Sequence, residues 1–526
     1  MVPRMWNNRQ IRFRSSRLVR FERTPWVPAP PRREAGETLQ HWIYRTLREP
    51  IAEGRLAPGT PVPSSRRLAA DLGISRGTVV LACEQLVTEG YLVSRPGAGM
   101  AVSPQVPDRA IAPRPAARHA APPGAVRAIG AVPGPFTSPP APIAFAPHRC
   151  ETRALPVDVL RRLHGRLLRR ANPWLFADGP AAGLPELRRA IAAYLGEARG
   201  LAVHEDQVLV VASMQQALDV ALRVLTSVGD PVWVEDPGYP GVRRLVEATG
   251  RTPVFVPVDE RGLRVEAGVA AAPGARLACV TPSRHAPLGV PLALARRAAL
   301  LDWARRTGGV IFEDDYDSEH RFGSRPVRPL AADDPSRVLL AGSFSKVLYP
   351  GLRIAYLVCP PAWLDAFAAT LSLGARHPNL LVQAVLSRFI DEGHLARHVR
   401  RMRRLYLERA QAFDDAARRH WAGLLEVPAL QAGLDVTVRL LRAGDDRDAA
   451  RRLRAAGVEC MPLAGYRARA ELPPALVMGF AAVDEHELAE AAPRVARALS
   501  DPDGANGTSR TSSGGRPRGG RASIAP

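Results

Sequence analysis

The apolar residues in the first hundred positions follow the spacing of short helices. A helix that ends at Gly54 is predicted by four apolar residues that recur every fourth position, Leu39, Ile43, Leu47 and Ile51. Between residues 63 and 86, serines precede two further short helical runs, and Gly73 supplies a tight turn between them. Two helices joined in this way predict a helix-turn-helix whose second helix starts at Ser75.

The segment that follows predicts a β-hairpin. Residues 91–102 contain two short strand-like runs around a glycine-rich turn, and Arg95 lies near the tip. The second helix of a helix-turn-helix enters the major groove by its N-terminal end, which here offers Ser75, Arg76 and Thr78. We therefore expect a small winged helix-turn-helix domain over residues 36–103 that binds double-stranded DNA.

From about residue 144, short apolar runs alternate with helical patterns. The runs that predict buried strands are 209–211, 232–234, 254–256, 277–280, 310–312, 338–340 and 354–358. This alternation is typical of an α/β domain with a mostly parallel sheet, and we expect it to cover residues 144–500. In such a sheet, ligands bind at the carboxyl ends of the strands.

Chemistry-bearing residues follow three of these strands directly. After the first strand, Ser213 and Met214 open a helix whose free N–H groups suit a phosphate. After the second strand comes Tyr239, whose ring can stack on a flat ligand. After the fifth strand come the carboxylate of Asp314 and the phenol of Tyr316. Because Asp314 and Tyr316 are two apart on an extended segment, we expect their side chains to point to the same side.

The only lysine of the chain, Lys346, follows the sixth predicted strand. Arginine cannot lose its proton in a protein, so a lysine kept in an arginine-rich chain is a candidate amine for attack on a carbonyl. Survival of one lysine by chance is the alternative. The neighbours favour the amine, because Ser343, Ser345, a predicted helix start and Arg353 form the second half of a phosphate cup.

Taken together, these residues fit pyridoxal 5′-phosphate. That cofactor needs an amine for its aldehyde, a carboxylate for its pyridine nitrogen, a donor for its phenolate, a ring partner and a phosphate cup. Each feature alone has a simpler explanation, such as a solvated turn, a helix cap or packing. Their order around a single lysine favours the cofactor.

Composition narrows the class of protein. The formal net charge of +21 favours a polyanionic partner such as nucleic acid. No run of 18 apolar residues and no secretory signal are present, and the five scattered cysteines contain no C-x-x-C pair. We expect a cytoplasmic protein without a metal site. We expect residues 1–35 to form a disordered basic arm and residues 501–526 to form a disordered tail. We expect residues 104–143 to form a Pro/Ala-rich linker.

The N-terminal domain resembles the winged helix of GntR-family regulators. The matching motifs are P-S-S-R (63–66), S-R-x-T-V (75–79), E-G-Y (89–91) and R-x-G-x-G (95–99). The resemblance implies that Arg66 and Arg76 contact bases or phosphates. It also implies that the wing, with Gly97 and Gly99, approaches the minor groove.

The large domain resembles fold-type I aminotransferases, and the order of domains resembles that of MocR-type regulators of the GntR family. Residues 183–188, 313–319 and 393–403 also match that subfamily. The resemblance implies that Lys346 forms the Schiff base, that Asp314 pairs with the pyridine nitrogen, that Tyr316 pairs with the phenolic oxygen, and that Tyr239 stacks. The residues that it implies for the phosphate are Ser213, Met214 (backbone), Ser343, Ser345 and Arg353.

The chain departs from the aminotransferase pattern near the expected substrate. Ser213 stands where a glycine is usual, Phe176 stands where a tyrosine often reaches the partner subunit, and residues 475–480 lack the arginine that binds a substrate carboxylate. The segment usually written T-P-S-H-Q-x-P-x-G carries Arg284, His285 and Ala286. These changes leave cofactor binding intact and weaken the expectation of transamination.

Three functions remain open at this point. The first is a transcription regulator whose aminotransferase-like domain binds pyridoxal phosphate and senses an amino compound or the cofactor itself. The second is a working aminotransferase with an appended DNA-binding domain, and the third is a regulator that lost the cofactor and kept the fold. By resemblance, we expect a head-to-tail homodimer.

Overall fold

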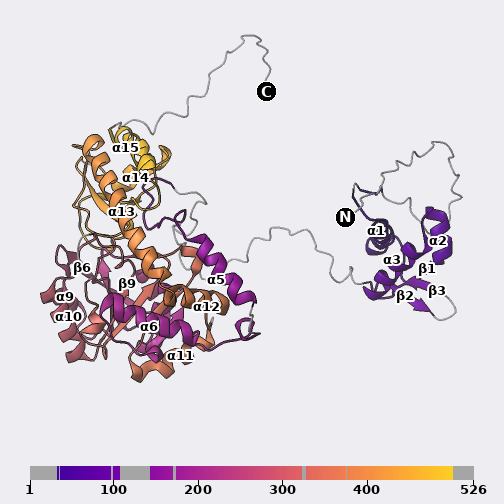
Figure 1. Ribbon diagram of the computed structural model, residues 1–526, viewed down its shortest axis with the longest axis horizontal. Coiled ribbons are helices and arrows are strands. Elements are labelled where there is room, and N and C mark those ends of the chain that lie inside the picture. Colours follow the sequence, from indigo (N-terminus) through magenta and orange to yellow (C-terminus); the bar gives the residue numbers. More distant parts are fainter. Residues whose placement is uncertain are drawn as a thin grey trace, which may run out of the picture. The chain divides into compact units, whose positions relative to one another are not determined.

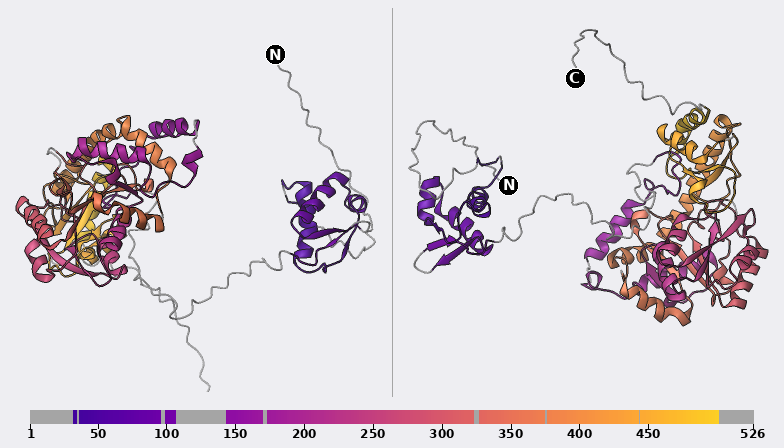
Figure 2. Two further views of the ribbon diagram at one scale, coloured as in Figure 1. Left: turned by 90° about the horizontal axis from the view of Figure 1, so that it is seen from below. Right: turned by 180° about the vertical axis from the view of Figure 1, so that it is seen from behind.

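The computed structural model describes residues 32–34, 36–95, 99–106, 143–169, 173–322, 327–374, 376–442 and 444–500, with only the backbone of Arg95. The chain divides into two compact units, residues 1–128 and 129–526. Figure 1 shows the ribbon, and Figure 2 shows it from two further sides. The expected tail lies outside the described residues, as does nearly all of the expected arm and of the expected linker.

The described residues of the first unit form three helices and a small sheet. The helices are α1 (Leu39–Ala52), α2 (Ser65–Leu72) and α3 (Arg76–Thr88), and the strands are β1 (Pro61–Val62), β2 (Leu92–Arg95) and β3 (Gly99–Val102) in the order β1-β3-β2. Ser64 Oγ accepts from the N–H of Arg67 and so caps α2, and Gly73 ends that helix with φ 67°. The predicted helix-turn-helix and hairpin are confirmed.

The second unit is built on a sheet of eight strands. They are β4 (Val208–Val211), β5 (Pro231–Asp236), β6 (Thr252–Asp259), β7 (Gly262–Leu263), β8 (Leu277–Val280), β9 (Val310–Asp315), β10 (Val338–Ser343) and β11 (Ala355–Val358), in the order β4-β11-β10-β9-β8-β5-β6-β7. The five strands from β10 to β6 run parallel, whereas β11 and β7 are antiparallel to their neighbours. The mostly parallel sheet predicted from the apolar runs is confirmed.

Helices cover both faces of this sheet. One core contains buried residues of the sheet and of α5 (Val157–Arg169), α6 (Pro185–Arg199), α9 (Val265–Ala271), α10 (Leu294–Thr307) and α12 (Leu380–Asp391). The core on the other face contains buried residues of α7 (Met214–Leu225), α8 (Pro240–Ala248) and α11 (Leu364–Leu373). The carboxyl ends of the parallel strands therefore lie between two helical layers, at one edge of the sheet.

A smaller antiparallel sheet completes this unit. Its strands are β12 (Leu425–Glu426), β13 (Asp435–Leu440), β14 (Met461–Pro462) and β15 (Ala475–Gly479), and it packs with α14 (Asp446–Ala455) and α15 (Glu485–Ser500). The long helix α13 (His394–His420) contributes Leu395 to the core of the large sheet and Phe413 to the core of the small one. Figure 1 shows α13 running between the two parts. In the described part of the chain, no helix combines the length and hydropathy that a membrane crossing requires.

Candidate active site and DNA interface

Lys346 lies in the turn that follows β10. Its Nζ donates to the backbone carbonyl of His148, and burial lowers its pKa. The prediction that a helix starts here is wrong. The N–H of Leu348 bonds to the carbonyl of Phe344 at 2.8 Å and so closes one turn, but Tyr349 is extended (φ −156°), as is usual for a residue before a proline, and the turn does not continue. Lys346 therefore projects from a tight turn in which the amine is partly removed from water.

Asp314 lies at the end of β9, on the strand next to the one that precedes Lys346. In the register of the two strands it stands opposite Ala341. Its Oδ1 is buried and has no hydrogen-bond partner among the described residues. Burial and the neighbouring Asp315 raise the pKa of Asp314 to about 8. Buried carboxyl oxygens normally accept a hydrogen bond, and the protonated ring nitrogen of a ligand would supply the missing donor.

Tyr239 lines the same pocket as Asp314. Other residues of that pocket include Glu235, Thr281 and Tyr466. The structure thus brings together the predicted ring partner, in the turn between β5 and α8, and the predicted carboxylate, at the end of β9. The flat ring of a cofactor fits the chemistry of this pocket, with an aromatic wall and an acid that lacks a partner.

The predicted phosphate residues meet at one edge of the sheet. In the strand register, Ala355 of β11 pairs with both Val211 and Ser343, so the ends of β4 and β10 lie on either side of the start of β11. This places the segments that carry Ser213 with Met214, Ser345, and Arg353 at the same edge. The positions suit an anion, because α7 begins there at Met214 and presents free N–H groups.

Two of the predicted hydroxyls already hold backbone groups. Ser213 Oγ accepts from the N–H of Gln216 at 3.2 Å and so caps α7. Ser343 Oγ accepts from the N–H of Ser345 at 3.1 Å. Each hydroxyl still has a proton to donate, so these bonds leave the two serines able to contact a phosphate. Arg353 is exposed and has φ 51°.

Tyr316 is held by Arg284, which the sequence showed only as a departure from the family pattern. Arg284 Nη1 donates to the hydroxyl of Tyr316 at 2.8 Å and to Asp317 Oδ2 at 2.9 Å, and its Nη2 lies 3.3 Å from Asp435 Oδ1. Gly433 makes room for this side chain, because a Cβ there would lie 2.3 Å from Arg284 Cζ. The two terminal nitrogens of the guanidinium are thus engaged by two carboxylates and a phenol.

His148 and Asp435 complete the surroundings of Lys346 and were missed from the sequence. His148 Nδ1 lies 2.8 Å from Asp435 Oδ2, and its Nε2 lies 2.5 Å from the hydroxyl of Tyr466. Burial raises the pKa of Asp435, but the charges of His148, Arg284 and Lys346 outweigh it and lower that pKa. His148 and Asp435 are 287 positions apart, so no local pattern could have paired them.

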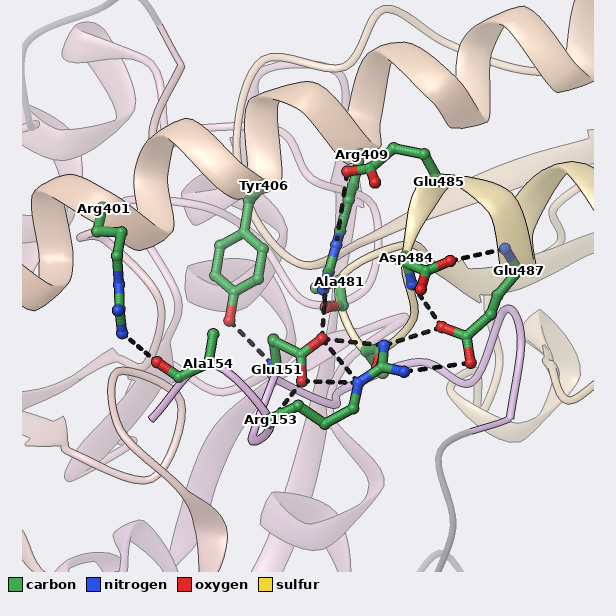
Figure 3. Close-up of polar contacts among 11 residues, drawn as sticks. Glu151, Arg153, Ala154, Arg401, Tyr406, Arg409, Ala481, Asp484, Glu485 and Glu487 are labelled. Carbon is green, nitrogen blue, oxygen red and sulfur yellow. Dashed lines mark hydrogen bonds and ion pairs between the residues drawn. The ribbon is translucent and has the colours of Figure 1, made fainter. Parts of the chain in front are cut away.

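A second buried carboxylate anchors the segment that carries His148. Glu151 Oε2 lies 2.7 Å from Arg409 Nη2 and 3.0 Å from Arg153 Nη2, and the N–H of Glu151 donates to the hydroxyl of Tyr406. Figure 3 shows Arg153 between Glu151 and Glu487. Burial raises the pKa of Glu151, but the hydrogen bonds from both arginines outweigh it and lower that pKa. This segment is therefore fixed to α13 and α15 beside the lysine.

The first unit exposes most of the predicted DNA contacts. Arg66 and Arg76 are exposed near the N-terminal ends of α2 and α3. Ser75 Oγ caps α3 by accepting from the N–H of Thr78, and the two hydroxyls lie 2.7 Å apart. Gly99 is exposed with φ 81°, whereas Gly97 and the side chain of Arg95 lie outside the described residues.

Two family models match the chain. Residues 39–102 match the gntR family of bacterial regulatory proteins, and residues 160–495 match aminotransferase class I and II. The probable rhizopine catabolism regulatory protein MocR of Rhizobium meliloti is 38% identical over 461 residues, which cover 87% of this chain and 93% of that protein. The pyridoxine biosynthesis transcriptional regulator PdxR of Corynebacterium glutamicum is 33% identical over 71% of this chain and 77% of its own.

Solved structures match the second unit. LysN, an α-aminoadipate aminotransferase of Thermus thermophilus complexed with N-(5′-phosphopyridoxyl)-L-leucine, is 28% identical with a TM-score of 0.63, covering 68% of this chain and 92% of that chain. Fold, site and matches together define a transcription regulator in which a GntR-type winged helix precedes an aminotransferase-like domain. Within this class, the chain belongs to the MocR-type subfamily of the GntR family.

Proposed function

We propose that this protein is a DNA-binding regulator whose second unit holds pyridoxal 5′-phosphate on Lys346 and senses an amino compound. The observation that carries the proposal is Asp314 Oδ1, which is buried without a partner in a pocket shared with Tyr239. The chain's only lysine lies after the adjacent strand, with a lowered pKa that favours the reactive neutral amine. LysN, a solved structure similar to this unit, binds a phosphopyridoxyl compound.

Each residue of the site has a distinct task in this proposal. Asp314 holds a proton on the pyridine nitrogen, Tyr316 donates to the phenolic oxygen, and Tyr239 stacks on the ring. The residues proposed for the phosphate are Ser213, Met214 through its backbone, Ser343, Ser345 and Arg353. The cofactor supplies an electrophilic carbon to which an amine can bond.

Regulation rather than turnover is favoured by two described places, β15 and Arg284, where no arginine is available for a substrate carboxylate. Strand β15 is entirely buried and apolar over residues 475–479. Arg284 already contacts Asp317, Asp435 and Tyr316. An amino acid bound beside Lys346 would therefore lack the arginine clamp on which efficient transamination depends.

Reduction with borohydride tests the lysine directly. The full chain loaded with pyridoxal phosphate should show the visible band of a Schiff base. After reduction and digestion, the added mass should lie on the peptide that contains Lys346. Lys346→Arg is the matched control, because it keeps the charge and cannot form the bond. A band of equal strength in that variant would contradict the assignment.

DNA binding and turnover separate the regulator from the enzyme. The full chain should enrich one sequence from random duplex DNA, and amino compounds that shift its melting temperature in the presence of the cofactor should change its affinity for that DNA. Turnover of amino donors with 2-oxoglutarate or pyruvate should be slow. Efficient turnover without enrichment of any sequence would support the aminotransferase instead.

We further propose that two copies associate head to tail, as resemblance to fold-type I enzymes implies. Four of the exposed large apolar side chains of the second unit lie within residues 157–176, which supports burial of this part against another copy. They are Val157, Leu168, Trp174 and Phe176. Light scattering of the full chain should give the mass of a dimer, and a monomer mass at micromolar concentration would contradict this arrangement.

A further inference from the structure

One apolar residue of the first unit lies on the outer face of α3. Leu81 is 53% exposed, although burial of a leucine side chain stabilises the folded state. The buried residues of α3 are Val79, Ala82, Cys83 and Leu86. At 3.6 residues per turn, the opposite face carries Gly77, Leu81, Glu84 and Thr88. Leu81 is therefore the one large apolar side chain on that face.

The surface next to Leu81 is open toward the start of the helix. A Cβ added at Gly77 would meet only Ser75 Oγ, at 4.0 Å, so no side chain fills the space one turn before Leu81. Side chains of a helix lean toward its N-terminus, so Leu81 covers the turn that begins at Gly77. That turn belongs to the end of α3 that a helix-turn-helix presents to base edges.

Charges around this end of the helix favour DNA as the occupant. Arg76 begins α3, and its Nε donates to Ser65 Oγ at 3.4 Å, so the start of α2 with the exposed Arg66 lies beside this end of α3. Both cations suit phosphates. Leucine can neither donate nor accept a hydrogen bond. The feature of a base edge in the major groove that matches it is the 5-methyl group of thymine.

We propose that Leu81 contacts the 5-methyl group of one thymine and thereby selects that base in the bound sequence. The inference rests on the proposed DNA-binding function and adds a residue that specifies sequence. Leu81 is exposed and helical, so Leu81→Ala should fold as the wild type does, since alanine has the highest helix propensity.

Deoxyuridine substitution tests this contact, because it removes the methyl group and leaves every hydrogen-bonding group in place. The full chain first enriches a sequence from random duplex DNA. Each thymine of that sequence is then replaced singly by deoxyuridine, and affinity is measured at fixed salt. We expect one position at which the wild type loses about fourfold in affinity, the effect of burying about one methyl group. Leu81→Ala should lose nothing further at that position.

Leu39→Ala is the matched control, because Leu39 is a 40% exposed leucine on α1. This variant should keep the full deoxyuridine effect. If Leu81→Ala also keeps it, or if no thymine is sensitive in the wild type, the inference is overturned and the proposed function stands. If the chain enriches no sequence at all, the proposed DNA-binding function fails and the inference fails with it.

Discussion

Two regions beside Lys346 contain buried carboxylates, and the pKa of these carboxylates is raised in one region and lowered in the other. At the carboxyl ends of the central strands, Asp314 has an oxygen without a partner and a pKa raised to about 8. In the segment 148–151 and its contacts, cations surround Asp435 and Glu151 and lower the pKa of each. A carboxylate whose charge the chain balances stabilises the fold, whereas the unpartnered oxygen of Asp314, in a pocket shared with Tyr239, is a candidate position for a ligand.

The two regions meet at a single side chain. Lys346 Nζ donates to the carbonyl of His148, and Asp314 lies on the strand next to the one that precedes the lysine. The ligand site therefore lies directly against a segment held in place by buried ion pairs. Replacing one carboxylate at a time separates the two roles.

The largest loss of stability is expected for Glu151→Gln. Its side chain is 3% exposed and that of Arg409 is 4% exposed, so the change leaves a buried guanidinium without its nearest carboxylate, and Glu485 remains at 3.9 Å. Removing one partner of a buried ion pair costs about 3–5 kcal/mol. The free energy of unfolding of the second unit, measured by chemical denaturation, should fall by that amount. An unchanged midpoint would show that this anchor does not stabilise the unit.

Asp314→Asn should change how stability depends on pH. The pKa of Asp314 is about 8 in the folded protein against 3.8 for the free side chain, so the folded state binds more protons between these values. Stability of the cofactor-free wild type should therefore fall as the pH rises from about 4 to about 8, and the amide removes that part of the dependence.

Above that window, the cofactor-free Asp314→Asn variant should be more stable than the wild type by about 1–3 kcal/mol, and the two should agree at the acidic end. Denaturation series at several pH values measure this. The variant should also bind pyridoxal phosphate more weakly. Parallel curves for the two proteins would contradict the raised pKa.

Tyr316→Phe should have a smaller effect. Arg284 loses its bond to the phenol and keeps those to Asp317 and Asp435. A lost hydrogen bond of this kind costs about 0.5–1.5 kcal/mol. Tyr349→Phe is the control, because its hydroxyl has no hydrogen-bond partner within the described ranges. If the cofactor contact is correct, Tyr316→Phe alone should also shift the visible absorbance of the loaded protein.

Asp158→Asn should have the smallest effect. Asp158 and Arg161 form an ion pair 2.7 Å apart, but the two side chains are 73% and 75% exposed. Water screens such a pair, and the free energy of unfolding should change by less than about 0.5 kcal/mol. A loss as large as that of Glu151→Gln would show that burial is not what separates the two carboxylates.

The sequence alone predicted most of the elements and singled out the residues of the candidate site. Apolar runs predicted seven strands of the large sheet, because a buried strand needs apolar residues on both faces. Serine caps and Gly73 predicted the helix-turn-helix, because helix ends have local requirements. Lys346, Asp314 and Tyr239 could be singled out because they follow strands whose ends converge at one edge.

Only the tertiary structure decided what surrounds the lysine. Glu151 and Arg409 are 258 positions apart, and His148 and Asp435 are 287 apart, so the packing of α13 and of the small sheet against the segment 148–151 brings each pair together. Arg284 looked like a simple departure from a motif until Asp317, Asp435 and the space at Gly433 were placed around it. The charge balance of a buried site depends on distances between side chains, and these arise from packing that local patterns do not encode.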